Sequence, residues 1–133
     1  TGQLTAQQLQ LTDTLDSNTT LVAGTVRTNQ GSVIQGNHPE DSHVLVDLDT
    51  LAPGAHVALS FQASINAQVN DTQVQNQAVA TFVNAAGGPT GQTVVISDDP
   101  DSADPLDATV TPLNGNPPRS RGKVFLPFAA RPN

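Results

Sequence analysis

Apolar residues recur at every second position over much of this chain, and no segment shows a helical period. The clearest run extends from Val57 to Val69, where the apolar residues share one parity and Ser, Gln and Asn hold most of the other. Such alternation predicts an antiparallel strand with one face on the core and one face in solvent. Several runs of this kind indicate an all-β protein.

Shorter apolar runs predict further strands, separated by residues that favour turns. The predicted strands cover residues 6–14, 21–26, 32–35, 43–48, 74–83, 94–96 and 108–111. Around the first of them, Leu9, Leu11 and Leu15 share a parity that also contains Asp13. In residues 52–55, Pro and Gly occupy the central positions of a type II turn. Short strands with turns between them are typical of an antiparallel β-sandwich.

The composition narrows the possible functions. A chain of 133 residues is long enough for one domain with a real core. Its net charge of −7 argues against nucleic acid as a partner, because phosphate binding needs a cationic surface. No apolar run approaches the length of a membrane span. The lack of Cys excludes disulfides and thiolate metal sites.

Positive charge is concentrated at the C-terminal end. Residues 119–133 contain four of the five cations and no acid, whereas residues 1–118 contain one cation and all twelve acids. The body of the chain therefore carries −11 and the tail +4. We divide the chain into a sandwich domain at 1–113, a linker rich in turn formers at 114–118, and a basic apolar tail strand at 119–133.

The tail strand has the pattern of a docking element. The residues that we expect to dock are Lys123, Val124, Phe125, Leu126 and Phe128. Burying such apolar side chains contributes roughly 1.5–3 kcal/mol each. The strand could fill a groove in its own chain, or it could be a donor strand that enters a neighbouring copy and builds a polymer of identical subunits. Pro127 is a difficulty for either arrangement, because proline cannot donate to a β-ladder.

Candidate chemistry is sparse. The best metal candidates lie in a proline-containing loop, where Asp98, Asp99, Asp101 and Asp104 could supply oxygen ligands to Ca²⁺. The alternative is a solvated loop whose Asp side chains cap turns. The three His residues have no ligand spacing, and no motif of a catalytic nucleophile or a phosphate loop is present. We therefore expect no enzyme activity.

The only Lys in the chain raises one covalent possibility. Surface sandwiches sometimes form Lys–Asn isopeptide bonds, and Lys123 could in principle react with Asn76. Such a bond requires a buried Lys, which is rare. The alternative is a solvent-facing Lys123 and an Asn76 that bonds to the backbone.

Several stretches together resemble a known family. The pattern comprises Asp13-Thr14-Leu15, Gly24, Leu51-Ala52-Pro53-Gly54, Asn76-Gln77-Ala78 and Ser97-Asp98-Asp99-Pro100 with Thr109, in that order over residues 2–112. It is similar to the surface-protein repeat family known as domain of unknown function number eleven, found in bacteria and archaea. The resemblance implies an immunoglobulin-like sandwich in secreted stalks, adhesins or filaments, without enzyme activity.

The start of the chain differs from that family. Family members begin with two more strands that end in an Asn-Thr-Gly turn, whereas this chain opens at Thr1-Gly2. We expect a sandwich that lacks these strands and exposes an apolar groove and strand edges. The predicted function is an extracellular or cell-surface filament or stalk subunit of a prokaryote. The alternative is an adhesin or ligand-binding module at the end of a larger secreted protein.

Overall fold

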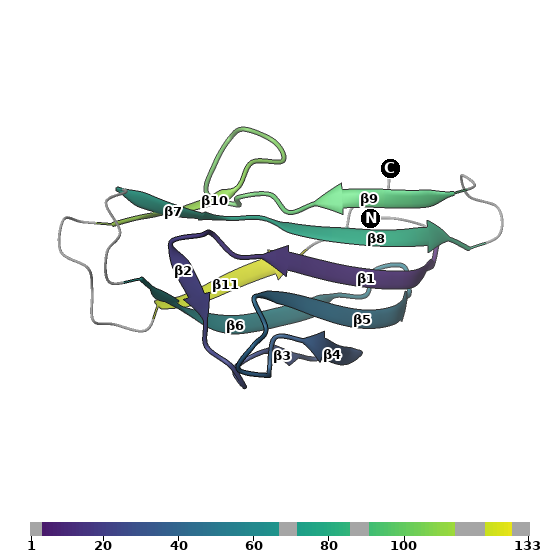
Figure 1. The fold of residues 1–133 in the computed structure, drawn as a ribbon. Helices are drawn as coiled ribbons and strands as arrows, with labels where there is room; N and C mark the ends of the chain where they lie inside the picture. The colour runs from purple at the N-terminus through teal and green to yellow at the C-terminus, as the bar shows by residue number, and fades with distance from the viewer. Residues whose placement is uncertain (1–3, 67–71, 86–90, 114–121, 129–133) are drawn as a thin grey trace.

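The computed structural model describes residues 4–66, 72–85, 91–113 and 122–128, the last segment as backbone alone. The regular structure among these residues consists of antiparallel strands (Figure 1). The prediction of an all-β sandwich is therefore confirmed. In this described part of the chain, no helix is long and apolar enough to cross a membrane.

A five-stranded sheet forms one layer of the sandwich, with the strand order β4-β5-β1-β8-β9. Its strands are β1 (Ala6–Thr14), β4 (Ser32–Gln35), β5 (His43–Leu51), β8 (Ala78–Asn84) and β9 (Gln92–Ile96). All neighbouring strands run antiparallel. Strand β1 carries an irregularity at Gln8, where φ is 52°, so that Ala6 and Leu9 both face the core despite their odd spacing.

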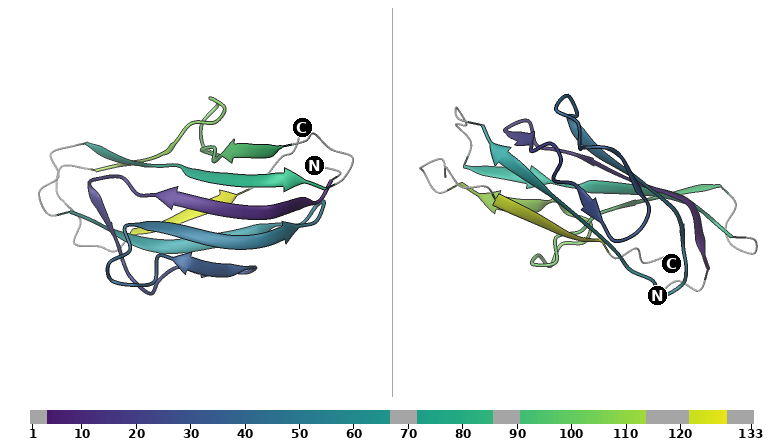
Figure 2. Two further views of the ribbon diagram at one scale, coloured as in Figure 1. Left: turned by 45° about the vertical axis from the view of Figure 1, so that its right-hand side comes forward. Right: turned by 90° about the horizontal axis from the view of Figure 1, so that it is seen from below.

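The second layer is built on β6 (Val57–Ile65). One edge of β6 pairs with β11 (Gly122–Phe128), and the other edge pairs with β2 (Thr19–Leu21) and β3 (Arg27–Thr28). A separate two-stranded ribbon joins β7 (Gln73–Asn76) to β10 (Thr109–Pro112). Figure 2 shows β6 and β11 crossing beneath the five-stranded sheet.

The core lies between the two layers, and its members follow the predicted parity. Buried apolar side chains come from alternate positions of each long strand: Leu9, Leu11, Val44, Val46, Leu48, Val57, Leu59, Phe61, Ala78, Ala80 and Phe82. The Pro53-Gly54 turn also forms as expected, with φ of 76° at Gly54 and the Ala55 N–H donating to the Ala52 carbonyl at 3.0 Å.

Three predicted strands differ in extent from the structure. The strand predicted from Val57 to Val69 ends at Ile65, and residues 67–69 lie outside the described residues. Residues 21–26 do not form one strand, because Gly24 adopts a φ of 76° and turns the chain between β2 and β3. The strand predicted at 74–83 is two strands, β7 and β8, separated at Gln77. The linker at 114–118 lies outside the described residues.

Candidate functional site

The edge of β6 that receives β11 is where the predicted docking residues lie. Strand β11 pairs antiparallel with β6 of the same chain. In this register Val124, Leu126 and Phe128 stand opposite Phe61, Leu59 and Val57, and Lys123 and Phe125 stand opposite Gln62 and Ser60. The first three partners on β6 are buried and the other two are half-buried. The alternation predicted for the tail thus coincides with the alternation of β6.

The register also removes the difficulty of Pro127, which stands opposite Ala58. The backbone N–H of Ala58 donates to the Asn29 side chain at 2.8 Å, and the Ala58 carbonyl accepts from the Asn29 N–H at 3.2 Å. Both groups of Ala58 are therefore directed toward β3 and away from β11. Because successive residues of a strand direct their backbone groups to opposite sides, β11 is not required to donate a hydrogen bond at Pro127.

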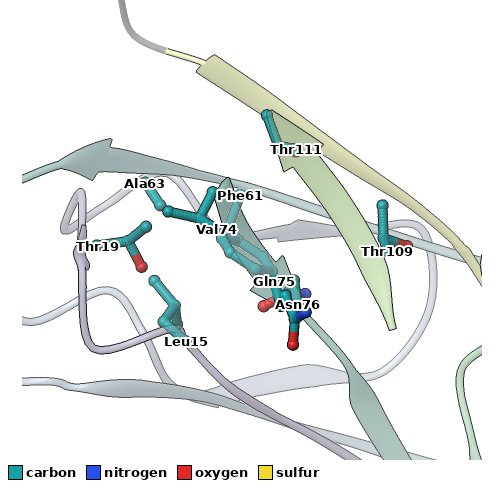
Figure 3. A pocket seen from close by; sticks show the side chains of 9 residues that line it. All are labelled: Leu15, Thr19, Phe61, Ala63, Val74, Gln75, Asn76, Thr109 and Thr111. Atoms are coloured by element: carbon teal, nitrogen blue, oxygen red, sulfur yellow. The ribbon is translucent and has the colours of Figure 1, made fainter. Parts of the chain in front are cut away.

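A small cavity lies between β6 and the β7–β10 ribbon (Figure 3). Its volume is about 30 Å³, and it is lined by Leu15, Thr19, Phe61, Ala63, Val74, Gln75, Asn76, Thr109 and Thr111. These residues come from β6, the β1–β2 region and the β7–β10 ribbon. A space of this size holds roughly two water molecules, so it offers no room for an organic ligand.

Behind this cavity wall the core buries a carboxyl group. Asp13 is 0% exposed, and one of its oxygens, Oδ2, accepts a hydrogen bond from Asn76 Nδ2 at 2.8 Å. Its other oxygen, Oδ1, is buried without a partner. Desolvation raises the pKa of Asp13 to about 6, against the opposing effect of the Asn76 hydrogen bond. The signal for this burial was present in the sequence, since Asp13 shares the parity of Leu9 and Leu11.

The Asp13–Asn76 pair places an acid beside an amide, but the described residues bring no amine to it. Lys123 is the only Lys in the chain, and its side chain lies outside the described residues. Its backbone stands opposite Gln62, one position away from the cavity residues Phe61 and Ala63. Neither the isopeptide bond to Asn76 nor a solvent-facing Lys123 is therefore tested by the described residues.

The acidic loop between β9 and β10 is held by its own carboxylates. The Leu106 N–H donates to Asp98 Oδ1 at 2.6 Å, the Asp101 N–H to Asp99 Oδ1 at 3.0 Å, and the Asp99 N–H to Asp107 Oδ1 at 3.3 Å. In the described part of the chain, no three carboxylate or His side chains converge as a metal site. The structure therefore does not bring Asp98, Asp99, Asp101 and Asp104 together around a common point.

Two further carboxylates also serve the backbone. Asp16 accepts from the N–H groups of Asn18 and Gln75, both at 2.8 Å, and these bonds lower its pKa. Asp41 accepts from the N–H groups of His38 and Gly36, and its pKa is lowered in the same way. These side chains shape loops rather than assemble a reactive centre.

No known protein family, curated protein or solved structure matches this chain. The fold and the candidate site define an all-β sandwich whose central strand β6 is covered on one edge by the C-terminal strand.

Proposed function

We propose that this protein is a non-catalytic structural module of a prokaryotic cell surface, joined to identical neighbours through its C-terminal strand in a filament or stalk. The observation that carries the proposal is the register of β11 on β6, which places each alternate apolar residue of the tail opposite a buried residue of β6. The likeness of the motifs to a family of surface-protein repeats supports the same function.

The contacts of β11 are well suited to exchange between copies. In the sheet order it is a terminal strand whose only strand partner among the described residues is β6. A second copy offers the same β6 edge, so a tail that crosses between copies makes identical pairings there. Since donor and acceptor surfaces differ, such exchange is head-to-tail and can continue into a polymer.

Charge favours the approach of one copy's tail to another copy's body. Residues 119–133 carry +4 and residues 1–118 carry −11. Complementary charge accelerates encounter and disfavours wrong orientations, and salt weakens both effects.

The absence of catalysis is part of the proposal. Six of the described carboxylates accept hydrogen bonds from backbone amides of turns and loops: Asp16, Asp41, Asp47, Asp98, Asp99 and Asp107. The cavity beside β6 has room only for water. A binding module at the end of a larger protein is the second candidate. The pairing of β11 with β6 of its own chain favours it, because that pairing needs no neighbour.

The assembly state of the full chain separates the two candidates. We expect light scattering and electron microscopy to show concentration-dependent polymers. Leu126→Pro abolishes them, because Leu126 stands opposite Leu59 at a position where β6 directs its backbone toward β11. Pro127→Ala is the matched control and leaves them intact. A folded, monodisperse wild-type monomer at all concentrations contradicts the filament and favours the binding module.

A further inference from the structure

Among the described residues, the outer edge of β9 has no strand partner and lacks the usual protection against pairing. In the described sheet β9 is terminal and pairs only with β8. Its sequence, Gln-Thr-Val-Val-Ile, has no charge and no Pro, and its register against β8 runs without a bulge. Val94 is 59% exposed, the highest value among the large hydrophobic side chains that the structure describes as exposed. Natural proteins normally blunt such edges with charge, Pro or a bulge.

The other described edges are blunted. Strand β7 is only four residues long, and its Gln75 N–H already donates to the Asp16 carboxylate at 2.8 Å. Strand β4 has a register shift between Val33 and Gln35, and β2 and β3 are only three and two residues long. Strand β10 ends in Pro112. In β11, the residue opposite Ala58 is Pro127, at a position whose backbone is directed away from β6 and toward the open edge. Strand β9 is thus the unprotected edge of the described fold.

The direction of the backbone groups on β9 follows from one hydrogen bond. The Ser97 N–H donates to the Ala78 carbonyl at 2.8 Å, so residue 97 is directed toward β8. Because backbone groups alternate along a strand, Val95 and Thr93 are also directed toward β8. The N–H and C=O groups of Gln92, Val94 and Ile96 are therefore directed to the open edge.

We propose that this edge binds the same edge of a second copy, with the two β9 strands antiparallel and a twofold axis at Val94. The arrangement is self-complementary, since Val94 stands opposite the second copy's Val94, and Gln92 opposite its Ile96. Each of these positions has its backbone groups free to exchange two hydrogen bonds with its partner. The two five-stranded sheets become one continuous sheet across the axis.

Charge selects the antiparallel orientation. The acidic loop begins at Asp98, directly after β9, whereas residues 84–97 carry no charge. Antiparallel pairing places each acidic loop beside the Gln92 end of the other copy's β9, which carries no charge. Parallel pairing would place the two acidic loops side by side, where like charges repel.

Cysteine trapping tests this interface directly, because the chain has no Cys of its own. Hydrogen-bonded antiparallel pairs have Cα atoms about 5.5 Å apart, within the range that a disulfide spans. We expect full-length Val94→Cys to form a covalent dimer under mild oxidation. Ile34→Cys is the matched control, since Ile34 is 52% exposed on the opposite edge of the same sheet. Equal crosslinking of the two variants overturns the proposal.

A second variant tests the interface without a covalent bond. Val94→Lys places two like charges at the twofold axis, and Ile34→Lys adds the same charge at the other edge. Both substitutions are made in the Leu126→Pro background, in which head-to-tail polymers are absent and the β9 contact remains. We expect sedimentation velocity to show a concentration-dependent dimer that is lost for Val94→Lys alone, with circular dichroism unchanged by either substitution. A dimer that survives Val94→Lys, or a Leu126→Pro chain without any dimer at high concentration, contradicts the β9 interface.

Discussion

The carboxyl group of Asp13 lies in the core between apolar strand partners. Its register neighbours are Val44 on β5 and Ala78 on β8, and its one hydrogen-bond partner is Asn76. A buried carboxylate without a charge partner is destabilising, so the group retains its proton to a higher pH than in water. The titration of Asp13 therefore makes the stability of the sandwich depend on pH.

The sign of that dependence follows from the pKa of Asp13, about 6 in the folded state against 3.8 in the unfolded chain. The free energy of unfolding is highest below pH 3.8, where Asp13 is protonated in both states. It declines as the pH rises from 3.8 to about 6 and is constant above that. The total loss is roughly 3 kcal/mol. We expect Asp13→Asn, which cannot ionise, to remove the decline, as measured by urea unfolding between pH 4 and 8.

Asp16→Asn is the matched control for this measurement. The pKa of Asp16 is lowered by the hydrogen bonds from the Asn18 and Gln75 amides. Ionised Asp16 therefore stabilises the folded state by a constant amount at higher pH, and this stabilisation is lost as the pH falls below about 4. A decline between pH 4 and 6 that persists in Asp13→Asn would show that another group causes it.

Gly31 is the residue at which the backbone leaves no room for a side chain. Its φ is 78°, and an added Cβ would overlap the backbone carbonyl oxygen of Asp47. We expect Gly31→Ala to lower the free energy of unfolding by about 1–3 kcal/mol more than Gly54→Ala. Gly54 has a similar φ of 76° but open space around it. Gly54→Ala therefore measures the free-energy cost of placing Ala in this backbone conformation without a steric clash. Equal losses in thermal unfolding would contradict a steric role for Asp47.

At the scale of the strands, the alternation of apolar residues predicted which faces are buried but not where strands end. The faces of β5, β6 and β8 follow from parity because each packs one side on the core. The interruption at Gln77 has no local signal, since Gln is compatible with a strand. At this position the Gln77 side chain donates hydrogen bonds to carbonyls twenty and more residues away in the sequence.

The candidate site was predictable to a similar degree. The tail residues that dock could be named from parity, but the register on β6 could not, because it pairs segments far apart in the sequence. The same is true of Pro127, whose acceptability depends on Asn29 bonding to Ala58 from the other side of β6. The hydrogen bonds of the acidic residues to backbone N–H groups could not be predicted either, because they depend on the conformation of the loop between β9 and β10.

Gln77 links the β7–β8 junction to the acidic loop. Its Nε2 donates to the Leu106 carbonyl at 3.0 Å and to the Ser97 carbonyl at 3.3 Å. We expect Gln77→Ala to lower stability by about 1–2 kcal/mol, in proportion to the hydrogen bonds lost. It should also speed hydrogen exchange in residues 98–107. Gln73→Ala, an exposed position on β7, is the control, and equal exchange in both variants would argue against the link.

At the scale of the whole molecule, the two ends of the sheet system have different properties. The β6 edge is covered by a basic apolar strand, whereas the β9 edge is charge-free and has no strand partner in the part of the chain that the structure describes. One edge therefore suits head-to-tail joining through the tail, and the other suits a symmetric lateral contact. The two proposed contacts together would let a subunit assemble along and across a fibre.

The most direct measurement traps the β11–β6 pair with cysteines at Ser60 and Phe125. These residues stand opposite each other in the register, at a position where β6 directs its backbone toward β3, and such pairs have Cα atoms about 4.5 Å apart. A chain with both substitutions reports whether the pair forms at all. A mixture of Ser60→Cys chains with Phe125→Cys chains, refolded together and oxidised, reports whether it forms between copies.

The strand-exchange account predicts covalent heterodimers in the mixture and none in either variant alone. A mixture that stays monomeric, while the double variant crosslinks within a single chain, would contradict it and show that the C-terminal strand remains on its own domain.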